Sequence, residues 1–353
     1  MQGRHAGVII AVVLFSSGYL FVHLLGEVSR LYNDTSKLER VVAKLQLDNI
    51  EIAHRHLSAA SYQDNTAQND DDLILIYNRV PKTGSTSFAG IAYDLCKKNK
   101  YNVIHINITK NGHTLSLPDQ VRFIANISEW TEKKPALYHG HLAYVEFSRF
   151  GLDKNPLYIN IIRDPLDRLV SYYYFVRYGD DFRPSVRRRK AGNTETFDDC
   201  VAKDGSDCDP ENLWLQIPFF CGHSAECWTP GNRWALEQAK FHLVNKYLLV
   251  GITEELGDFI AVLEATLPRF FHGAVELYNF GRKSHLRKTS NKVQPKPETL
   301  EKIQESQVWK LENEFYEFAV EQFHFIKHQT FDLTNGAYVE KGNRFHYEKI
   351  RPR

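Results

Sequence analysis

The chain has 353 residues, 43% of them hydrophobic and 25% charged, and its formal net charge is +1. These values are ordinary for a globular protein and allow one large or two medium domains with a buried core. Because the net charge is so small, no overall electrostatic field indicates a polyanion partner, and any anion-binding site must be local.

An apolar run without Asp, Glu, Lys or Arg occupies residues 7–25, GVIIAVVLFSSGYLFVHLL. As a helix it spans roughly 28 Å, close to the ~30 Å hydrocarbon core of a bilayer. A cleaved signal peptide is the alternative, but its apolar region is normally about 7–15 residues long, and no convincing cleavage site precedes Glu27. We therefore expect an uncleaved signal-anchor at 7–25, a short cytoplasmic tail at 1–6 and a lumenal body, as in a single-pass type II membrane protein.

The segment after the anchor, residues 26–71, carries a seven-residue repeat and is predicted to be a stem. Its two sets of core positions are Val28, Thr35, Val42 and Asn49, and Leu31, Leu38, Leu45 and Ile52. This spacing predicts a self-associating coiled coil in which Asn49 sets the register; a single amphipathic stem helix is the alternative. A polar, acidic stretch at 58–72 reads as a linker, and the lumenal domain is expected at 72–353.

Sequons and cysteines agree with a lumenal body. N-glycosylation sequons stand at Asn33, Asn107 and Asn126, a pattern that is individually common by chance. Two closely spaced pairs, which predict local disulfides and leave Cys96 free, are Cys200 with Cys208 and Cys221 with Cys227. A zinc site made of these four cysteines and His223 is the alternative, although the spacing typical of zinc-binding cysteine pairs is missing.

Strand and helix signals alternate through the predicted lumenal domain. Continuous apolar runs, typical of strands buried on both faces, lie at 73–77, 157–162 and 247–252. Helices are expected at 88–96, from Pro165 to Tyr178, at 259–267 and at 298–327. This order predicts an α/β fold in which a central, mostly parallel, P-loop-like sheet is flanked by helices, with a terminal hairpin or arm around Asn335-Gly336.

The loop after the first predicted strand, at 78–87, has the features of an anion cradle. It combines small residues, several hydroxyl groups and Lys82, and the N-terminus of a helix follows it. It lacks the glycine spacing of a Walker A motif, and no clear acidic partner for Mg²⁺ follows a later strand. We therefore expect a nucleotide site without a metal ion; a Ser/Thr-rich turn with a solvated lysine is the alternative.

A second pair of polar residues follows the predicted strand at 157–162. Arg163 stands at the end of this strand, and Ser171 lies about two turns into the helix after it. Because the carboxyl ends of parallel strands meet at one crevice, these residues are expected to face the loop at 78–87. An arginine and a hydroxyl there suit a second phosphate group.

The two elements together, PKTGSTS at 81–87 and IIRDPLDRLVSYYY at 161–174, resemble the 5′-phosphosulfate loop and the 3′-phosphate motif of sulfotransferases that use 3′-phosphoadenosine 5′-phosphosulfate (PAPS). The chain is most similar to the heparan sulfate 2-O-sulfotransferase family of the Golgi. The similarity covers residues 72–349 and includes YDLC at 93–96, YHGH at 138–141, RRRK at 187–190, the cysteine pairs and KSHLRK at 283–288. It implies PAPS as co-substrate, no metal, a Golgi membrane location and a homotrimer.

Sulfuryl transfer needs a base for the acceptor hydroxyl and a cation for the leaving phosphate. Lys82 is expected to stabilise that phosphate, and His141, with His139 beside it, is the candidate base; a satisfied, partly buried histidine is the alternative for either. By resemblance the donor is surrounded by Lys82, Thr83, Gly84, Ser85, Thr86, Ser87, Arg163, Ser171, Tyr278, Ser284 and Thr289. The sugar chain is contacted by Arg79, Tyr93, His105, Arg183, Arg188 and Arg287.

Two basic clusters fit a polyanionic acceptor, because guanidinium groups bind sulfate and carboxylate through paired hydrogen bonds. They are Arg183 with Arg187, Arg188, Arg189 and Lys190, and Arg282 with Lys283, His285, Arg287 and Lys288. A solvated basic face or a nucleic-acid patch is the alternative, and the predicted lumenal location argues against nucleic acid.

We therefore expect a Golgi enzyme that sulfates the 2-hydroxyl of iduronic, less often glucuronic, acid in heparan sulfate. An alternative acceptor is the uronic acid of dermatan or chondroitin. A non-catalytic heparan-binding protein on the same fold predicts a broken donor loop or missing histidines. A P-loop kinase is disfavoured by the absent Walker A pattern.

Overall fold

The computed structural model describes residues 23, 26, 72–108, 112–151, 156–181, 183–281, 288–334 and 337–341. The chain divides into two compact units, 1–65 and 66–353. Of the first unit the structure describes His23 and Gly26, both helical, so the predicted anchor and stem otherwise lie outside the described residues. Within the described ranges, no helix has the length and apolar character needed to span a bilayer.

A five-stranded sheet forms the centre of the second unit. Its strands are β1 (Ile74–Asn78), β2 (Asn102–Ile106), β3 (Ala136–Gly140), β4 (Leu157–Ile162) and β5 (Tyr247–Ile252). They lie in the order β2-β3-β1-β4-β5, and every neighbouring pair is parallel. The predicted central parallel sheet is therefore confirmed, and β1, β4 and β5 fall on the three apolar runs.

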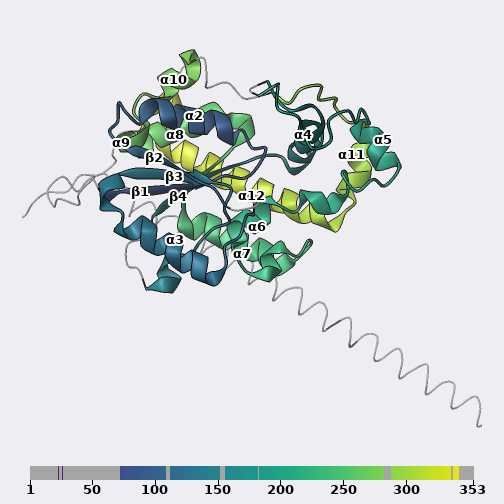
Figure 1. Cartoon of the computed structure of the whole chain (residues 1–353), viewed down its shortest axis with the longest axis horizontal. Coiled ribbons are helices and arrows are strands. Elements are labelled where there is room, and N and C mark those ends of the chain that lie inside the picture. Colours follow the sequence, from purple (N-terminus) through teal and green to yellow (C-terminus); the bar gives the residue numbers. More distant parts are fainter. Residues whose placement is uncertain are drawn as a thin grey trace, which may run out of the picture. The chain divides into compact units, whose positions relative to one another are not determined.

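Helices flank both faces of this sheet. The described helices of seven or more residues are α2 (Ser85–Leu95), α3 (Leu117–Glu129), α4 (Pro165–Tyr178), α7 (Arg233–Lys246), α8 (Leu256–Thr266), α10 (Ala274–Phe280), α11 (Pro297–Gln304) and α12 (Gln307–Thr330). Shorter ones are α5 (Phe197–Ala202), α6 (Gln216–Cys221) and α9 (Pro268–Phe271). Helices α2 and α8 cover one face and α3, α6 and α7 the other, while α12 packs along β5 and α7 (Figure 1).

The single helix predicted at 298–327 is wrong, because the structure has two helices there. α11 ends at Gln304, and the Ser306 hydroxyl caps α12 by accepting a hydrogen bond from the Trp309 N–H at 3.1 Å. Serine at a helix N-cap satisfies an N–H group that has no partner within the helix. This local cap starts a new helix although the apolar periodicity continues through the break.

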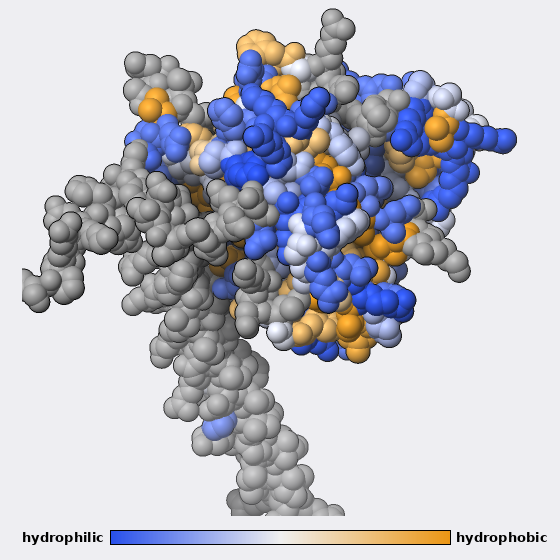
Figure 2. Space-filling model, turned by 60° about the vertical axis from the view of Figure 1, so that its left-hand side comes forward, coloured by the Kyte–Doolittle hydropathy of each residue, from blue (hydrophilic) through white to orange (hydrophobic). Residues whose placement is uncertain are grey.

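The predicted terminal hairpin is present as β6 (Phe331–Thr334) paired antiparallel with β7 (Ala337–Glu340). The core lies between the sheet and its helices and is rich in aromatic rings such as Tyr77, Phe88 and Phe259. Figure 2 shows a face on which hydrophilic residues predominate and apolar ones lie in separate groups. The strand order also places β1 where the chain changes direction across the sheet, so the carboxyl ends of β1, β3 and β4 form the expected ligand crevice.

Candidate active site

A loop with unusual backbone geometry follows β1. Lys82 and Gly84 both have left-handed conformations, with φ of 69° and 71°, and α2 begins at the next residue, Ser85. A positive φ is uncommon for a residue other than glycine, and such strained positions gather at functional sites. The Thr83 hydroxyl donates to the Val80 carbonyl oxygen at 3.0 Å and closes the loop. The loop leads directly into the first N–H groups of α2, which suit an anionic group.

The ammonium group of Lys82 joins this loop to two distant parts of the chain. Its Nζ donates to Oγ1 of Thr289 at 3.1 Å, and Oγ1 of Thr289 lies 3.1 Å from Oγ of Ser171 in α4. The same Nζ lies 4.1 Å from the centroid of the Phe175 ring, which is a cation–π distance. The structure thus brings together three of the residues predicted to surround the donor.

The segment that carries Thr289 is held against the C-terminal end of α4. Thr289 forms an antiparallel bridge with Asp180, and the Ser290 N–H donates to the Gly179 carbonyl oxygen at 3.2 Å. The adjoining N–H of Asp181 donates to the carbonyl oxygen of Lys288 at 3.3 Å. This pairing explains how a residue more than a hundred positions after Ser171 reaches the same site.

Arg163 lies directly after β4 and points toward the loop after β1. Its guanidinium donates to the Lys82 carbonyl oxygen at 3.4 Å and to the Asp167 carboxylate at 3.1 Å. Lys292 lies on the other oxygen of Asp167, at 3.4 Å. Both predicted halves of the nucleotide site therefore meet, and Lys292 adds a cation that the sequence motifs did not single out.

His141 follows β3 and has one ring nitrogen engaged by the backbone. Its Nδ1 lies 2.8 Å from the Arg79 carbonyl oxygen, so Nδ1 carries the proton and donates it. Among the residues that the structure describes, no hydrogen bond to Nε2 is found. In a neutral ring this second nitrogen has a lone pair, which is the property that a general base requires.

His139 has the opposite tautomer and no free lone pair. The Arg79 guanidinium donates to its Nδ1 at 3.2 Å, so Nε2 carries the proton and donates to the Tyr93 hydroxyl at 2.9 Å. The ring is 2% exposed and stacks on His105 at a centroid distance of 4.9 Å. Gly140 separates the two histidines, and a β-carbon there would lie 2.4 Å from the Ile106 carbonyl oxygen, so the close approach of β2 requires glycine.

Both histidines are held in the neutral form. Burial, reinforced by the Arg79 charge, lowers the pKa of His139 to about 3 and that of His141 to about 4. The same two causes lower the pKa of His105. At neutral pH, His141 is therefore already in the protonation state from which it can accept a proton.

Three residues predicted to contact the sugar chain surround His139. Arg79 is 9% exposed and also donates to the hydroxyl oxygens of Ser85 and Thr86 at 3.3 and 3.2 Å. Tyr93 and His105 are exposed beside it. The Arg79 guanidinium therefore connects His139 to the loop after β1 and the start of α2.

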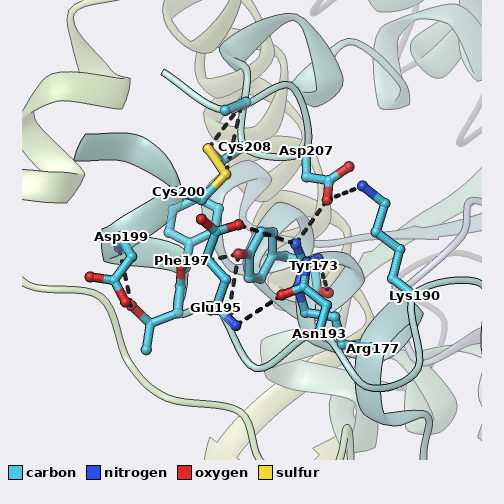
Figure 3. A network of polar contacts seen from close by, with 12 residues as sticks. Tyr173, Arg177, Lys190, Asn193, Glu195, Phe197, Asp199, Cys200, Asp207 and Cys208 are labelled. Carbon is cyan, nitrogen blue, oxygen red and sulfur yellow. Dashed lines mark hydrogen bonds and ion pairs between the residues drawn. A yellow bond between two sulfur atoms is a disulfide. The ribbon is translucent and has the colours of Figure 1, made fainter. Parts of the chain in front are cut away.

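The first predicted basic cluster is divided by ion pairs within the protein. Arg188 pairs with Asp180 at 3.3 Å and lies over the Phe175 ring that also faces Lys82. Lys190 pairs with Asp207 at 2.5 Å, and the buried Arg177 donates to the same carboxylate at 2.8 Å (Figure 3). Lys190 therefore contributes to fixing its own segment, while the neighbouring Arg183, Arg187 and Arg189 remain exposed.

The segment after this cluster is fastened by a disulfide and by Tyr173. The structure contains the predicted Cys200–Cys208 bond, whose short loop carries Asp207, and the predicted Cys221–Cys227 bond; Cys96 is free. The Tyr173 hydroxyl donates to the carbonyl oxygens of residues 195 and 196 at 3.1 and 3.0 Å (Figure 3). Because the four sulfur atoms are bonded in pairs, the zinc alternative is wrong.

Some predicted positions lie apart from this centre or outside the described residues. Ser284 and Arg287 are outside them, as is most of the second basic cluster. Tyr278 lies in α10 against Gly257, where a β-carbon would come within 3.1 Å of its ring. The sequon residues Asn107 and Asn126 are exposed.

Sequence reasoning missed two residues that contact the predicted positions. His113 has Nδ1 3.4 Å from the His141 carbonyl oxygen and stacks on Trp228. Gln216 forms two hydrogen bonds with the backbone of Arg163. No local motif marks either residue, because their partners are 28 and 53 positions away in the sequence.

Comparison with known proteins connects this geometry to one family. Residues 65–319 match the family described as the Sulfotransferase family. The chain belongs to the sulfotransferase family. Heparan sulfate 2-O-sulfotransferase 1 of Homo sapiens is 56% identical over 345 residues, which cover 98% of this chain and 96% of the relative. The Gallus gallus protein of the same name has the same identity and coverage. A heparin sulfate O-sulfotransferase of Drosophila melanogaster is 57% identical over 284 residues, 80% of each chain. The family resemblance seen in the motifs is thereby confirmed.

Proposed function

We propose that this protein transfers a sulfuryl group from PAPS to the 2-hydroxyl of iduronic, less often glucuronic, acid in heparan sulfate. The observation that carries the proposal is the meeting of the loop after β1 with a neutral His141, whose Nε2 has no hydrogen-bond partner among the described residues. The relatives named above, similar over nearly the whole chain, support heparan sulfate as the acceptor.

The donor would bind across the carboxyl ends of β1 and β4. Its phosphosulfate end fits the loop from Lys82 to Ser87, and its 3′-phosphate fits Arg163 and Ser171, which lie beside that loop. The remaining donor contacts that we propose are Tyr278, Ser284 and Thr289. Lys82 would stabilise the negative charge that builds on the phosphate oxygen as the bond to sulfur breaks.

His141 is the proposed general base. Its Nε2 takes the proton of the acceptor hydroxyl while the new oxygen–sulfur bond forms, and the bond from sulfur to the phosphate oxygen breaks on the opposite side. The products are the sulfated sugar and adenosine 3′,5′-bisphosphate. Both ring nitrogens of His139 form hydrogen bonds. We therefore propose that His139 holds Arg79 and Tyr93 in place and does not transfer the proton.

The acceptor chain would lie over the face formed by Arg79, Tyr93, His105, Arg183, Arg188 and Arg287. These side chains offer charge and hydrogen bonds to sulfate and carboxylate groups. Arg79 donates to the hydroxyl groups of Ser85 and Thr86, which lie in the proposed donor loop. We therefore propose that donor binding changes the position of Arg79 and thereby affects acceptor binding.

We further propose a type II Golgi membrane protein with its catalytic domain, 72–353, in the lumen. The apolar run at 7–25 supports the anchor, and the two disulfides support an oxidising compartment. The heptads at 28–52 and the family support a homotrimer joined partly through the stem.

Incorporation of labelled sulfate from PAPS into desulfated heparan tests this function. The full chain should transfer label, and His141→Ala should lower turnover by about 10²–10⁴-fold, the range for loss of a general base. Binding of adenosine 3′,5′-bisphosphate to the variant should be unchanged. A wild-type chain that binds heparan and the nucleotide without transferring label would be a non-catalytic heparan-binding protein, and the proposal would be wrong.

A further inference from the structure

The turn that carries Arg163 lies beyond the hydrogen-bonded part of the sheet. β4 pairs with β1 as far as Ile159 and with β5 as far as Ile162. The Gln216 side chain then takes the place of a neighbouring strand: the Arg163 N–H donates to Oε1 at 2.9 Å, and Nε2 donates to the Arg163 carbonyl oxygen at 2.8 Å. Gln216 is completely buried, so water cannot replace these two bonds without opening the core.

The residues on either side of Arg163 are held in a similar way. Oγ1 of Thr253 donates to the Ile162 carbonyl oxygen at 2.9 Å, and the Glu254 carboxylate accepts a hydrogen bond from the Asp164 N–H at 3.1 Å. Side chains therefore hold three consecutive backbone positions. Only at Arg163 are both the N–H and the carbonyl oxygen held by one side chain, which orients the peptide groups on both sides of the residue.

A carboxylate from a distant helix fixes Gln216 itself. Oε1 of Glu312 in α12 accepts hydrogen bonds from the N–H groups of Leu215 and Ile217, at 2.9 and 3.1 Å, which flank Gln216 in the chain. Glu312 is fully buried. The backbone around Gln216 is thus attached to a long helix, and its amide has little freedom to turn away from Arg163.

The backbone orientation of Arg163 determines the direction in which its side chain leaves the turn, and so where its guanidinium lies. In the structure the guanidinium contacts both the Lys82 carbonyl oxygen and Asp167. Paired hydrogen bonds from a guanidinium to a phosphate depend strongly on geometry. We propose that Gln216 is a positioning residue that holds Arg163 in the orientation that recognises the 3′-phosphate of the donor, an inference that rests on the function proposed above.

Binding of two nucleotides to the full-length chain tests this inference. Adenosine 3′,5′-bisphosphate carries the 3′-phosphate and adenosine 5′-monophosphate lacks it, so the ratio of their Kd values reports recognition of that group alone. In Gln216→Met, which keeps the side-chain length but cannot form the two bonds, the preference for the bisphosphate should fall by about 10- to 100-fold, as for a misplaced binding group. The Kd of the monophosphate should stay within about twofold, and the donor KM should rise while kcat at saturating donor changes little.

Two further variants separate the possible explanations. Gln120→Met removes a different buried glutamine, which donates to the Leu115 carbonyl oxygen away from this turn, and should lower Tm without changing the preference. Arg163→Ala should abolish the preference. If it does and Gln216→Met keeps the wild-type preference, Gln216 only stabilises the fold and the inference is wrong. A wild-type preference in Arg163→Ala would instead contradict the donor site itself.

Should Gln216→Met not accumulate as folded protein, Gln216→Asn serves the same purpose. Its amide is one methylene too short to reach both backbone groups of Arg163, so the same fall in preference is expected. An unchanged preference in this variant overturns the inference equally.

Discussion

Replacing Glu312 by glutamine should change the pH dependence of stability. Burial raises the pKa of this carboxyl group from 4.5 to about 7, although the Arg168 charge and hydrogen bonds from Leu215 and Ile217 oppose the effect. The folded protein therefore keeps this proton over a pH range in which the unfolded chain has lost it. The resulting stabilisation is fully present below the unfolded pKa and is lost as the pH rises through about 7.

The size of the effect follows from these two values. One pKa unit corresponds to about 1.4 kcal/mol, and between pH 5 and pH 8 the stabilisation from this one group falls by about 2.5 kcal/mol. Glutamine keeps an oxygen for the two N–H groups but does not titrate. The difference in free energy of unfolding between wild type and Glu312→Gln should therefore shift by about 2.5 kcal/mol in favour of the variant over this range.

Urea unfolding at several pH values, with the disulfides intact, measures this difference. Glu314→Gln is a matched control on the same helix. Glu314 pairs with Arg233 and Lys240, and despite its partial burial those partners lower its pKa. Its carboxyl group is therefore mostly ionised in both states above pH 5, and its curve should run nearly parallel to wild type. A Glu312→Gln difference that stays constant from pH 5 to pH 8 would refute the buried, proton-holding state of Glu312.

The remaining predictions concern the reaction and the assembly. Lys82→Ala should lower kcat far more than it weakens glycan binding, and a change confined to glycan affinity would make Lys82 a binding residue only. His139→Ala should lose about 10- to 100-fold in activity, because the hydrogen bond from the charged Arg79 guanidinium is broken. His139→Gln can still accept that hydrogen bond and should keep more activity. Equal losses in the two variants would contradict the positioning role. Because the pKa of His141 is about 4, kcat/KM should stay level from pH 7.5 to 5.5, and an acidic limb near pH 6.5 would argue against this base. Deleting residues 28–57 should weaken oligomers in sedimentation experiments. Unchanged assembly would show that the stem does not contribute to the oligomer interface.

Much of the sheet could be predicted because burial leaves a local signal. β1, β4 and β5 are continuous apolar runs, as expected for strands covered on both faces. β2 lies at the edge and is only half buried, and β3 contains a histidine and ends in glycine, so neither stands out. The order of the strands is a long-range property that no local pattern contains.

The site could be predicted where its residues follow strand ends. Lys82 and Arg163 do so, and the geometry of parallel sheets brings such positions together. Thr289 was predicted only from the family resemblance. An antiparallel bridge to Asp180 brings it to the candidate site, and no local pattern predicts such a bridge. Sequence patterns do not mark Lys292, Gln216 or Glu312, because their contacts are with segments distant in the sequence.

The most direct test of the proposed activity is transfer of labelled sulfate from PAPS to desulfated heparan, dermatan and chondroitin, followed by disaccharide analysis of each product. We expect label in heparan, on the 2-hydroxyl of iduronic acid and in smaller amount of glucuronic acid. Label found mainly in dermatan or chondroitin, or at another position of heparan, would contradict the proposed acceptor.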